Sequence, residues 1–128
     1  MTPRRYQLKK EAVAIVERGH PWVFREQMSS AAAVFADGQW LRLVVGQNRV
    51  IGHGIYEAEG AIAIRVLRRG PDAPGAAWLR AQLAAAIAKR DAVSGGPEGT
   101  RTTGVRLVHG ESDGIPAVVV DRFGEVAV

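Results

Sequence analysis

Hydrophobic and polar residues alternate with a period of two over residues 39–67. The alternating positions are Leu41, Leu43 and Val45 in one segment and Ile62, Ile64 and Val66 in the other. Because successive side chains of a β-strand point to opposite faces, this period predicts strands. Residues 46–48 (GQN) predict a hairpin turn, since glycine and asparagine adopt positive φ readily. Residues 50–56 are therefore expected to form the return strand.

One short helix is predicted near the start of the chain. Ala12, Ile15 and Val16 follow helical spacing within residues 10–18, and Gly19 stands where a left-handed cap would end the helix. The next segment, residues 20–24 (HPWVF), favours extended backbone before the proline and a strand after it. Residues 1–70 thus combine several short strands with one helix, which predicts a small, partly closed barrel.

A second unit is expected after the proline- and glycine-rich break at residues 70–75. Residues 76–93 predict a helix, and residues 94–100 predict a flexible connection. Further strands are expected at residues 105–108, 117–120 and 126–128. Because the last strand would leave an unpaired apolar edge, we expect the chain to be part of a longer protein. The predicted fold is mainly β with α, with a barrel domain at residues 1–70 and an incomplete α/β domain at residues 71–128.

Positive charge is concentrated in the first part of the chain. Residues 1–70 contain 11 Lys and Arg against 6 Asp and Glu, whereas residues 71–128 contain 6 against 7. Fourteen of the 17 basic residues are arginine, whose planar guanidinium binds phosphate in a bidentate manner and stacks on bases. This bias favours nucleic acid as a partner, although a GC-rich genome would also enrich arginine and alanine.

Several function classes are excluded or disfavoured. The chain contains no cysteine, so disulfides, thiolate metal sites and cysteine nucleophiles are excluded within it. The apolar runs, at residues 31–36 and 83–88, are too short to span a bilayer, and no basic-then-apolar leader opens the chain. We therefore expect no membrane segment and a cytoplasmic protein.

The motifs that suggest catalysis lack the context that catalysis requires. Residues 110–114 (GESDG) fit the G-x-S-x-G nucleophile elbow around Ser112, beside His109, but a Val-rich strand is expected where the elbow needs a helix. Residues 52–54 (GHG) lack the third glycine and the helix of a dinucleotide site, and favour a strand with close backbone approach. The three histidines are scattered over different predicted elements, which argues against a metal site.

The candidate RNA-binding residues surround the predicted junction between the first helix and the strand that follows it. A glycine there would let a phosphate-sugar backbone approach closely, with cations on either side. His20 has an alternative role as a half-buried imidazole that bonds the backbone, and Trp22 and Trp40 could either stack bases or pack in the core. The predicted set comprises Lys9, Lys10, Arg18, Gly19, His20 and Arg25.

Four segments resemble one protein family in chain order. Residues 18–24 (RGHPWVF) and 51–56 (IGHGIY) are similar to segments of the N-terminal PUA domain of bacterial ribosomal RNA large-subunit methyltransferases of the 5-methylcytosine type. The most specific match is residues 106–116 (RLVHGESDGIP), followed by residues 120–124 (VDRFG). The resemblance covers the whole chain, and it implies a PUA pseudo-barrel followed by the start of a middle domain.

The resemblance also implies what the chain does and what it lacks. Full members of the family continue into a C-terminal domain that binds S-adenosylmethionine. The resemblance implies that this sequence covers only the part before that domain. Methylation at cytosine carbon five requires a thiolate, so no catalytic residue and no cofactor site are expected here. The expected function is to position ribosomal RNA for that missing methyltransferase domain. The alternative is a docking module, or a dimerisation module that forms a homodimer, without a direct RNA role.

Overall fold

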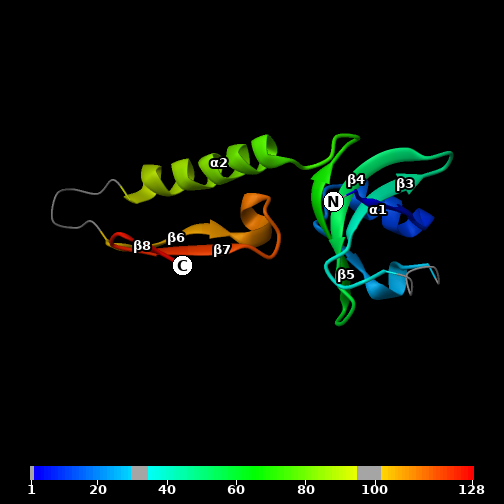
Figure 1. The fold of residues 1–128 in the computed structure, drawn as a ribbon, viewed down its shortest axis with the longest axis horizontal. Helices are drawn as coiled ribbons and strands as arrows, with labels where there is room; N and C mark the ends of the chain where they lie inside the picture. The colour runs from blue at the N-terminus through cyan, green and yellow to red at the C-terminus, as the bar shows by residue number, and fades with distance from the viewer. Residues whose placement is uncertain (1, 30–34, 95–101) are drawn as a thin grey trace. The chain divides into compact units, whose positions relative to one another are not determined.

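The computed structural model describes residues 2–29, 35–94 and 102–128, which form eight strands in two sheets and two α-helices (Figure 1). The fold is thus mixed α and β, as the sequence predicts. The chain divides into two compact units, Met1–Pro74 and Gly75–Val128. Among the described residues, no helix combines the length and the apolar character needed to cross a bilayer.

Unit 1 is built around a five-stranded sheet in the order β1-β3-β4-β5-β2. Its elements are β1 (Arg4–Gln7), α1 (Lys10–Glu17), β2 (Trp22–Phe24), the short 3₁₀ helix η1 (Arg25–Gln27), β3 (Trp40–Val45), β4 (Arg49–Tyr56) and β5 (Ile62–Arg69). β1 pairs with β3 in parallel, and the other neighbours are antiparallel. The predicted hairpin is present between β3 and β4, where Gly46 and Asn48 both have positive φ. The strand β1 is an addition that the hydrophobic pattern does not predict.

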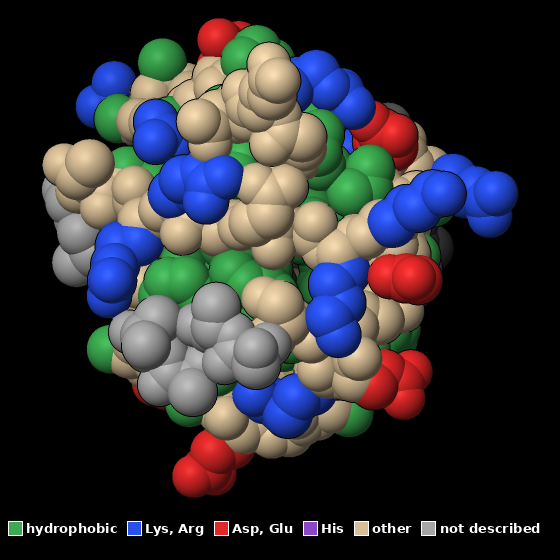
Figure 2. Space-filling model, turned by 90° about the vertical axis from the view of Figure 1, so that its right-hand side faces the viewer, with side chains coloured by type: hydrophobic (Ala, Val, Ile, Leu, Met, Phe, Trp, Pro, Cys, Tyr) green, Lys and Arg blue, Asp and Glu red, His purple; other side chains and the backbone are tan. Residues whose placement is uncertain are grey.

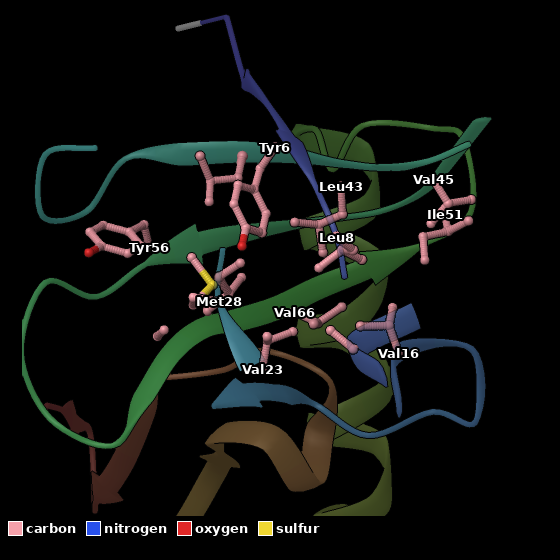
Figure 3. Close-up of a cluster of buried hydrophobic side chains, with 14 residues drawn as sticks. Tyr6, Leu8, Val16, Val23, Met28, Leu43, Val45, Ile51, Tyr56 and Val66 are labelled. Atoms are coloured by element: carbon pink, nitrogen blue, oxygen red, sulfur yellow. The ribbon is translucent and has the colours of Figure 1, made fainter. Parts of the chain in front are cut away.

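The core of unit 1 lies between one face of this sheet and α1. Figure 3 shows Leu43 and Val66 from the sheet converging with Val16 from the helix and Val23 from β2. Leu41, Leu43 and Ile64 are fully buried, as expected from the period-two pattern. Each large aliphatic side chain that is removed from water in this way contributes about 1.5–3 kcal/mol to folding.

The end of α1 has the geometry that the sequence predicts. Arg18 is the C-cap, and Gly19 follows with φ +98°. The Gly19 amide donates to the Val16 carbonyl at 3.0 Å, and the His20 amide donates to the Ile15 carbonyl at 3.1 Å. This pair of bonds is a Schellman motif, which needs a left-handed residue at Gly19. The motif turns the chain sharply into β2.

Residues 52–54 (GHG) lie within β4, where backbone approaches closely, as predicted. A Cβ atom on Gly54 would lie 2.7 Å from both the Arg65 carbonyl oxygen and the Ile64 Cγ2 atom. Side chains do not tolerate such distances, so only glycine fits while β4 and β5 keep this register. The register of β4 against β5 shifts at His53/Gly54, and an irregularity of this kind locally bends the paired strands.

Unit 2 packs one helix on a small antiparallel sheet. Its elements are α2 (Ala76–Ser94), β6 (Gly104–His109), the 3₁₀ helix η3 (Gly110–Asp113), β7 (Val119–Phe123) and β8 (Val126–Ala127). The sheet order is β6-β7-β8, and Figure 1 shows α2 running alongside this sheet. The predicted strand at residues 117–120 begins later than expected because Ala117 has φ +65° in the preceding turn. The predicted connection at residues 94–100 lies almost wholly outside the described residues.

The Gly-Glu-Ser-Asp-Gly segment of unit 2 is a structural junction. Ser112 is exposed on η3, which leads into a turn and then β7. The Asp113 side chain is only 2% exposed. It accepts hydrogen bonds from Arg90 Nη1 at 2.7 Å, Lys89 Nζ at 3.3 Å and the His109 amide at 2.8 Å. The hydrogen bond from Arg90 holds the pKa of the Asp113 carboxyl well below its usual range, and the other two bonds act in the same direction. Asp113 therefore joins α2 to the end of β6.

Candidate nucleic-acid interface

The α1–β2 junction is held in place by an arginine from β5. The Arg69 guanidinium donates a hydrogen bond to the Gly19 carbonyl, 50 residues away in sequence. A Cβ atom on Gly19 would lie 3.6 Å from that guanidinium and would also strain the positive φ. Glycine at this position therefore permits both the helix cap and the approach of a cation to the backbone.

Two further arginines flank the same junction. Arg49, at the start of β4, forms an ion pair of 3.0 Å with Glu17 at the end of α1. Arg18 is exposed, and no described residue makes a hydrogen bond or an ion pair with its guanidinium. We call Arg18, Gly19, His20, Arg49 and Arg69 the junction cluster. It contributes three guanidinium groups against the single carboxylate of Glu17.

An open groove of about 520 Å³ lies beside the junction cluster. It is lined by Val16 and Glu17 of α1, residues 49–51 of β4 and residues 69–71 at the end of β5. Its floor is mostly aliphatic, while Arg49 and Arg69 supply positive charge. Figure 2 shows Lys and Arg side chains spread over one face of the molecule, several of them around exposed hydrophobic surface. An apolar floor flanked by arginines can accept a base or ribose together with its phosphate.

His20 is exposed, whereas its alternative role expects a half-buried imidazole that bonds the backbone. Its Nδ1 lies 3.1 Å from the Trp22 carbonyl oxygen and 3.2 Å from the Trp22 amide nitrogen, so it does bond the backbone. The His20 ring also contacts the rings of Trp22 and Phe24, with centroids 5.7 and 5.8 Å away. His20 therefore presents an ordered aromatic ring beside Gly19.

The remaining predicted residues lie away from the junction. Lys9 and Lys10 are exposed at the opposite end of α1, about 12 Å along the helix axis. Arg25 follows the far end of β2, and its guanidinium donates to the carbonyls of Glu57 and Gly60 at 2.7 Å each. Arg25 thus links the end of β2 to the β4–β5 connection, and its guanidinium is hydrogen-bonded to protein carbonyls.

Arg49 and Arg69 are the residues that sequence reasoning misses. Both lie on strands whose contact with the junction depends on sheet register: Arg69 pairs with Gly52, and Arg49 pairs with Val45. The sequence signal was the run of residues 68–69 (RR) at the end of an alternating strand, which indicates a basic strand end without indicating its neighbour.

Metal and cofactor sites are not assembled by the described residues. No group of three or more His, Asp or Glu side chains within them could hold a metal ion. A methyl-donor nucleotide would need a glycine-rich turn between a strand and a helix of a parallel unit. In the described part of the chain, the parallel pair β1 and β3 brackets α1, whose N-cap is Lys9 instead of a glycine turn. These residues do not fit S-adenosylmethionine.

Comparisons with known proteins agree with this architecture. The PUA-like domain family matches residues 7–69. A ribosomal RNA large subunit methyltransferase of Deinococcus radiodurans is 33% identical over 126 residues, which cover 97% of this chain and 31% of that protein. Ribosomal RNA large subunit methyltransferase I of Shewanella amazonensis is 30% identical, with the same coverage. The chain thus spans about a third of the length of these curated relatives.

Solved structures show the same fold at lower sequence identity. A putative SAM-dependent methyltransferase from Streptococcus mutans superposes with a TM-score of 0.77 at 14% identity, over 97% of this chain and 31% of that one. A putative methyltransferase complexed with SAH superposes with a TM-score of 0.78, at the same identity and coverage. Residues 7–69 therefore form a PUA-like domain, and the chain is homologous over nearly its whole length to part of the ribosomal RNA large subunit methyltransferases.

Proposed function

We propose that unit 1 binds structured ribosomal RNA through the junction cluster and positions it for a methyltransferase. The observation that carries this proposal is the convergence of Arg18, Arg49 and Arg69 on one glycine-capped helix end beside an open groove. The three guanidiniums would hold phosphates, while the exposed backbone at Gly19 would admit the sugar-phosphate chain closely. The names of the curated relatives support ribosomal RNA as the partner.

The chemistry of methylation belongs, in this proposal, to a domain outside the described units. The structural neighbours include a methyltransferase complexed with SAH, which supports S-adenosylmethionine as the donor of the parent enzyme. The proposed target is a cytosine of the large-subunit RNA, as the sequence resemblance implies. Methylation at cytosine carbon five needs a cysteine thiolate, and this chain contains none. The proposed part played by this chain is to bind and orient the RNA.

Salt dependence of RNA affinity tests this proposal. Each phosphate that a cation neutralises releases counterions, so the logarithm of the affinity should fall with the logarithm of salt by about 0.7–0.9 per contact. For the three arginines of the junction cluster, the expected slope is roughly −2 to −3. Fluorescence anisotropy with a labelled stem-loop RNA at several salt concentrations measures it. An affinity that does not change with salt, or no binding at low salt, would contradict the proposal.

Exposed apolar side chains in unit 2 favour a second candidate function, docking or dimerisation. Phe123 and Val126 are each 61% exposed, and Val128 is 77% exposed, along the β7–β8 edge of the small sheet. Large exposed apolar side chains that lie next to an open strand edge are typical of interaction surfaces. Analytical ultracentrifugation distinguishes the cases, because a dimer that Phe123→Ser dissociates supports this candidate and a monomer at every concentration contradicts dimerisation.

A further inference from the structure

The outer side of the unit 1 sheet carries two rows of basic and aromatic residues. Residues that pair across neighbouring strands point to the same side of a sheet. Leu41 and Leu43 point into the core, so the residues that alternate with them point outward. The pairing register gives one row of Arg5, Arg42, His53 and Arg68, and a second row of Trp40, Ile55, Arg65 and Trp22. We call these eight residues the outer sheet face.

In the first row, acidic groups of the described residues match only part of the positive charge. Arg42 is exposed, and no described residue forms a hydrogen bond or an ion pair with its guanidinium. Arg5 is exposed, and its partners among the described residues are neutral: its guanidinium donates to the side-chain oxygens of Asn48 at 2.6 Å and Gln7 at 2.7 Å. Arg68 is partly neutralised by Asp72 at 2.9 Å. Arg5 and Arg42, on β1 and β3, are therefore the better candidates in this row for binding an anion.

His53 lies between Arg42 and Arg68 in this row and is only 2% exposed. Its Nδ1 atom has no hydrogen-bond partner among the described residues. Burial lowers the pKa of the His53 imidazole, and the charges of Arg42 and Arg68 lower it further, whereas Asp72 acts in the opposite direction. His53 is therefore buried between two arginines, and the positive charge of this row is carried by its arginine side chains.

The aromatic side chain of Trp40 lies near Arg42 on β3. Trp40 lies two residues before Arg42 on β3, so both side chains leave the same side of the strand, about 6.6 Å apart along it. The Trp40 side chain is half-buried on the outer sheet face, and Trp40 pairs with Ile55 on the neighbouring strand β4. Proteins that bind unpaired nucleic acid combine such features, because an aromatic ring stacks a base while a neighbouring cation holds its phosphate.

We propose that the outer sheet face binds an unpaired segment of RNA, with phosphates on Arg5 and Arg42 and a base stacked on Trp40. This inference rests on the proposed RNA-binding function and adds a second surface to it. The junction cluster binds phosphates of structured RNA without reading bases, whereas the outer sheet face selects single strands, because a paired base does not offer its face to Trp40. An acidic protein partner would use Arg42 in the same way, but it would not require Trp40 to stack.

Two RNA probes separate the surfaces. The full chain is titrated with an unpaired oligoribonucleotide of about 12 nucleotides and with a duplex of about 16 base pairs, a length that a duplex-binding domain can span. Trp40→Ala should weaken single-strand binding by about 10-fold, since stacking of one base contributes about that factor. The same variant should leave duplex affinity unchanged. Arg42→Gln should reduce the salt slope for the single strand by about one.

Matched variants keep this test decisive. Trp78→Ala removes a half-buried tryptophan from α2 in unit 2 and should leave both affinities unchanged. Trp40→Phe preserves an aromatic face and should retain most of the single-strand affinity. This variant keeps the test usable if Trp40→Ala does not fold. The inference is overturned if a folded Trp40→Phe binds the single strand as weakly as Trp40→Ala does, or if a folded Trp40→Ala binds it like the wild type. It is also overturned if Arg42→Gln leaves the salt slope for the single strand unchanged. A different result contradicts the proposed RNA-binding function itself: the wild-type chain binds neither the single strand nor the duplex.

Discussion

Reversing two charges of the junction cluster should weaken binding of a stem-loop RNA by about 100-fold at low salt. The double variant Arg18→Glu with Arg49→Glu removes two proposed phosphate contacts, each of which contributes about 1.5 kcal/mol as a charge-assisted hydrogen bond. Both side chains are exposed, and the Arg49 ion pair with Glu17 is a surface pair, so the fold should keep its stability to within about 1 kcal/mol. Anisotropy titrations and thermal melts of the same samples measure both quantities.

The matched control makes the same change of charge in unit 2. Arg80→Glu with Arg122→Glu alters the net charge by the same amount at residues of α2 and β7. If the junction cluster is the binding surface, this control should lose no more than a few-fold in affinity through the long-range field, which salt screens. Equal losses in the two double variants would show that RNA responds to net charge alone, and the assignment to the junction cluster would then be wrong.

Removing the Asp113 carboxylate should destabilise unit 2 by about 3 kcal/mol at neutral pH. Asp113→Ala removes the only charged acceptor that the described residues give the Arg90 guanidinium, which keeps its bonds to the Ala86 and Arg106 carbonyls. It also removes the side-chain acceptor of the His109 amide. Loss of each of these two bonds costs about 1–3 kcal/mol. Urea denaturation, followed by NMR at amides of Gly75–Val128, measures the change. Asp121→Ala is the control, because it removes a more exposed ion pair with Arg106, and it should cost less than about 1 kcal/mol.

The pH dependence of the same variant has a definite sign. The folded state lowers the pKa of Asp113, so this carboxylate contributes its full stabilisation above the pKa of the unfolded chain, about 4. The contribution is lost as the pH falls through the lower pKa of the folded state. The stability difference between wild type and Asp113→Ala should therefore be constant from about pH 6 to 8 and shrink below about pH 4. A difference that grows as the pH falls would contradict the role of Asp113.

Local rules predict much of this fold. The left-handed cap at Gly19, the hairpin at Gly46 and Asn48, and the close approach at Gly54 each depend on neighbours in sequence or on a residue type with few alternatives. In contrast, β1 is missed because only Tyr6 of its four residues is buried, and because its partner β3 begins more than 30 residues later in the chain. A single buried position carries no periodic signal.

The candidate site is predicted only in part for the same physical reason. Arg18, Gly19 and His20 are adjacent in sequence, so a helix end followed by a strand brings them together. Arg69 reaches the junction through the register of β5 against β4, and that register includes a bulge that no local pattern reveals. The sequence also predicts Arg25 as an RNA contact from its nearness to His20, and this stays a prediction. The structure places Arg25 after the end of β2, where its guanidinium donates to the Glu57 and Gly60 carbonyls.

The central claim is that RNA meets unit 1 at the junction cluster, and mapping the contact by NMR tests it most directly. Unlabelled stem-loop RNA is added to the isotope-labelled full chain, and shifts of backbone amides and arginine side chains are followed at low and high salt. We predict that the largest shifts occur at Arg18, Gly19, His20, Arg49 and Arg69, and that they diminish as salt is raised. Shifts confined to Gly75–Val128, or none at these five residues while RNA is bound, would contradict the claim.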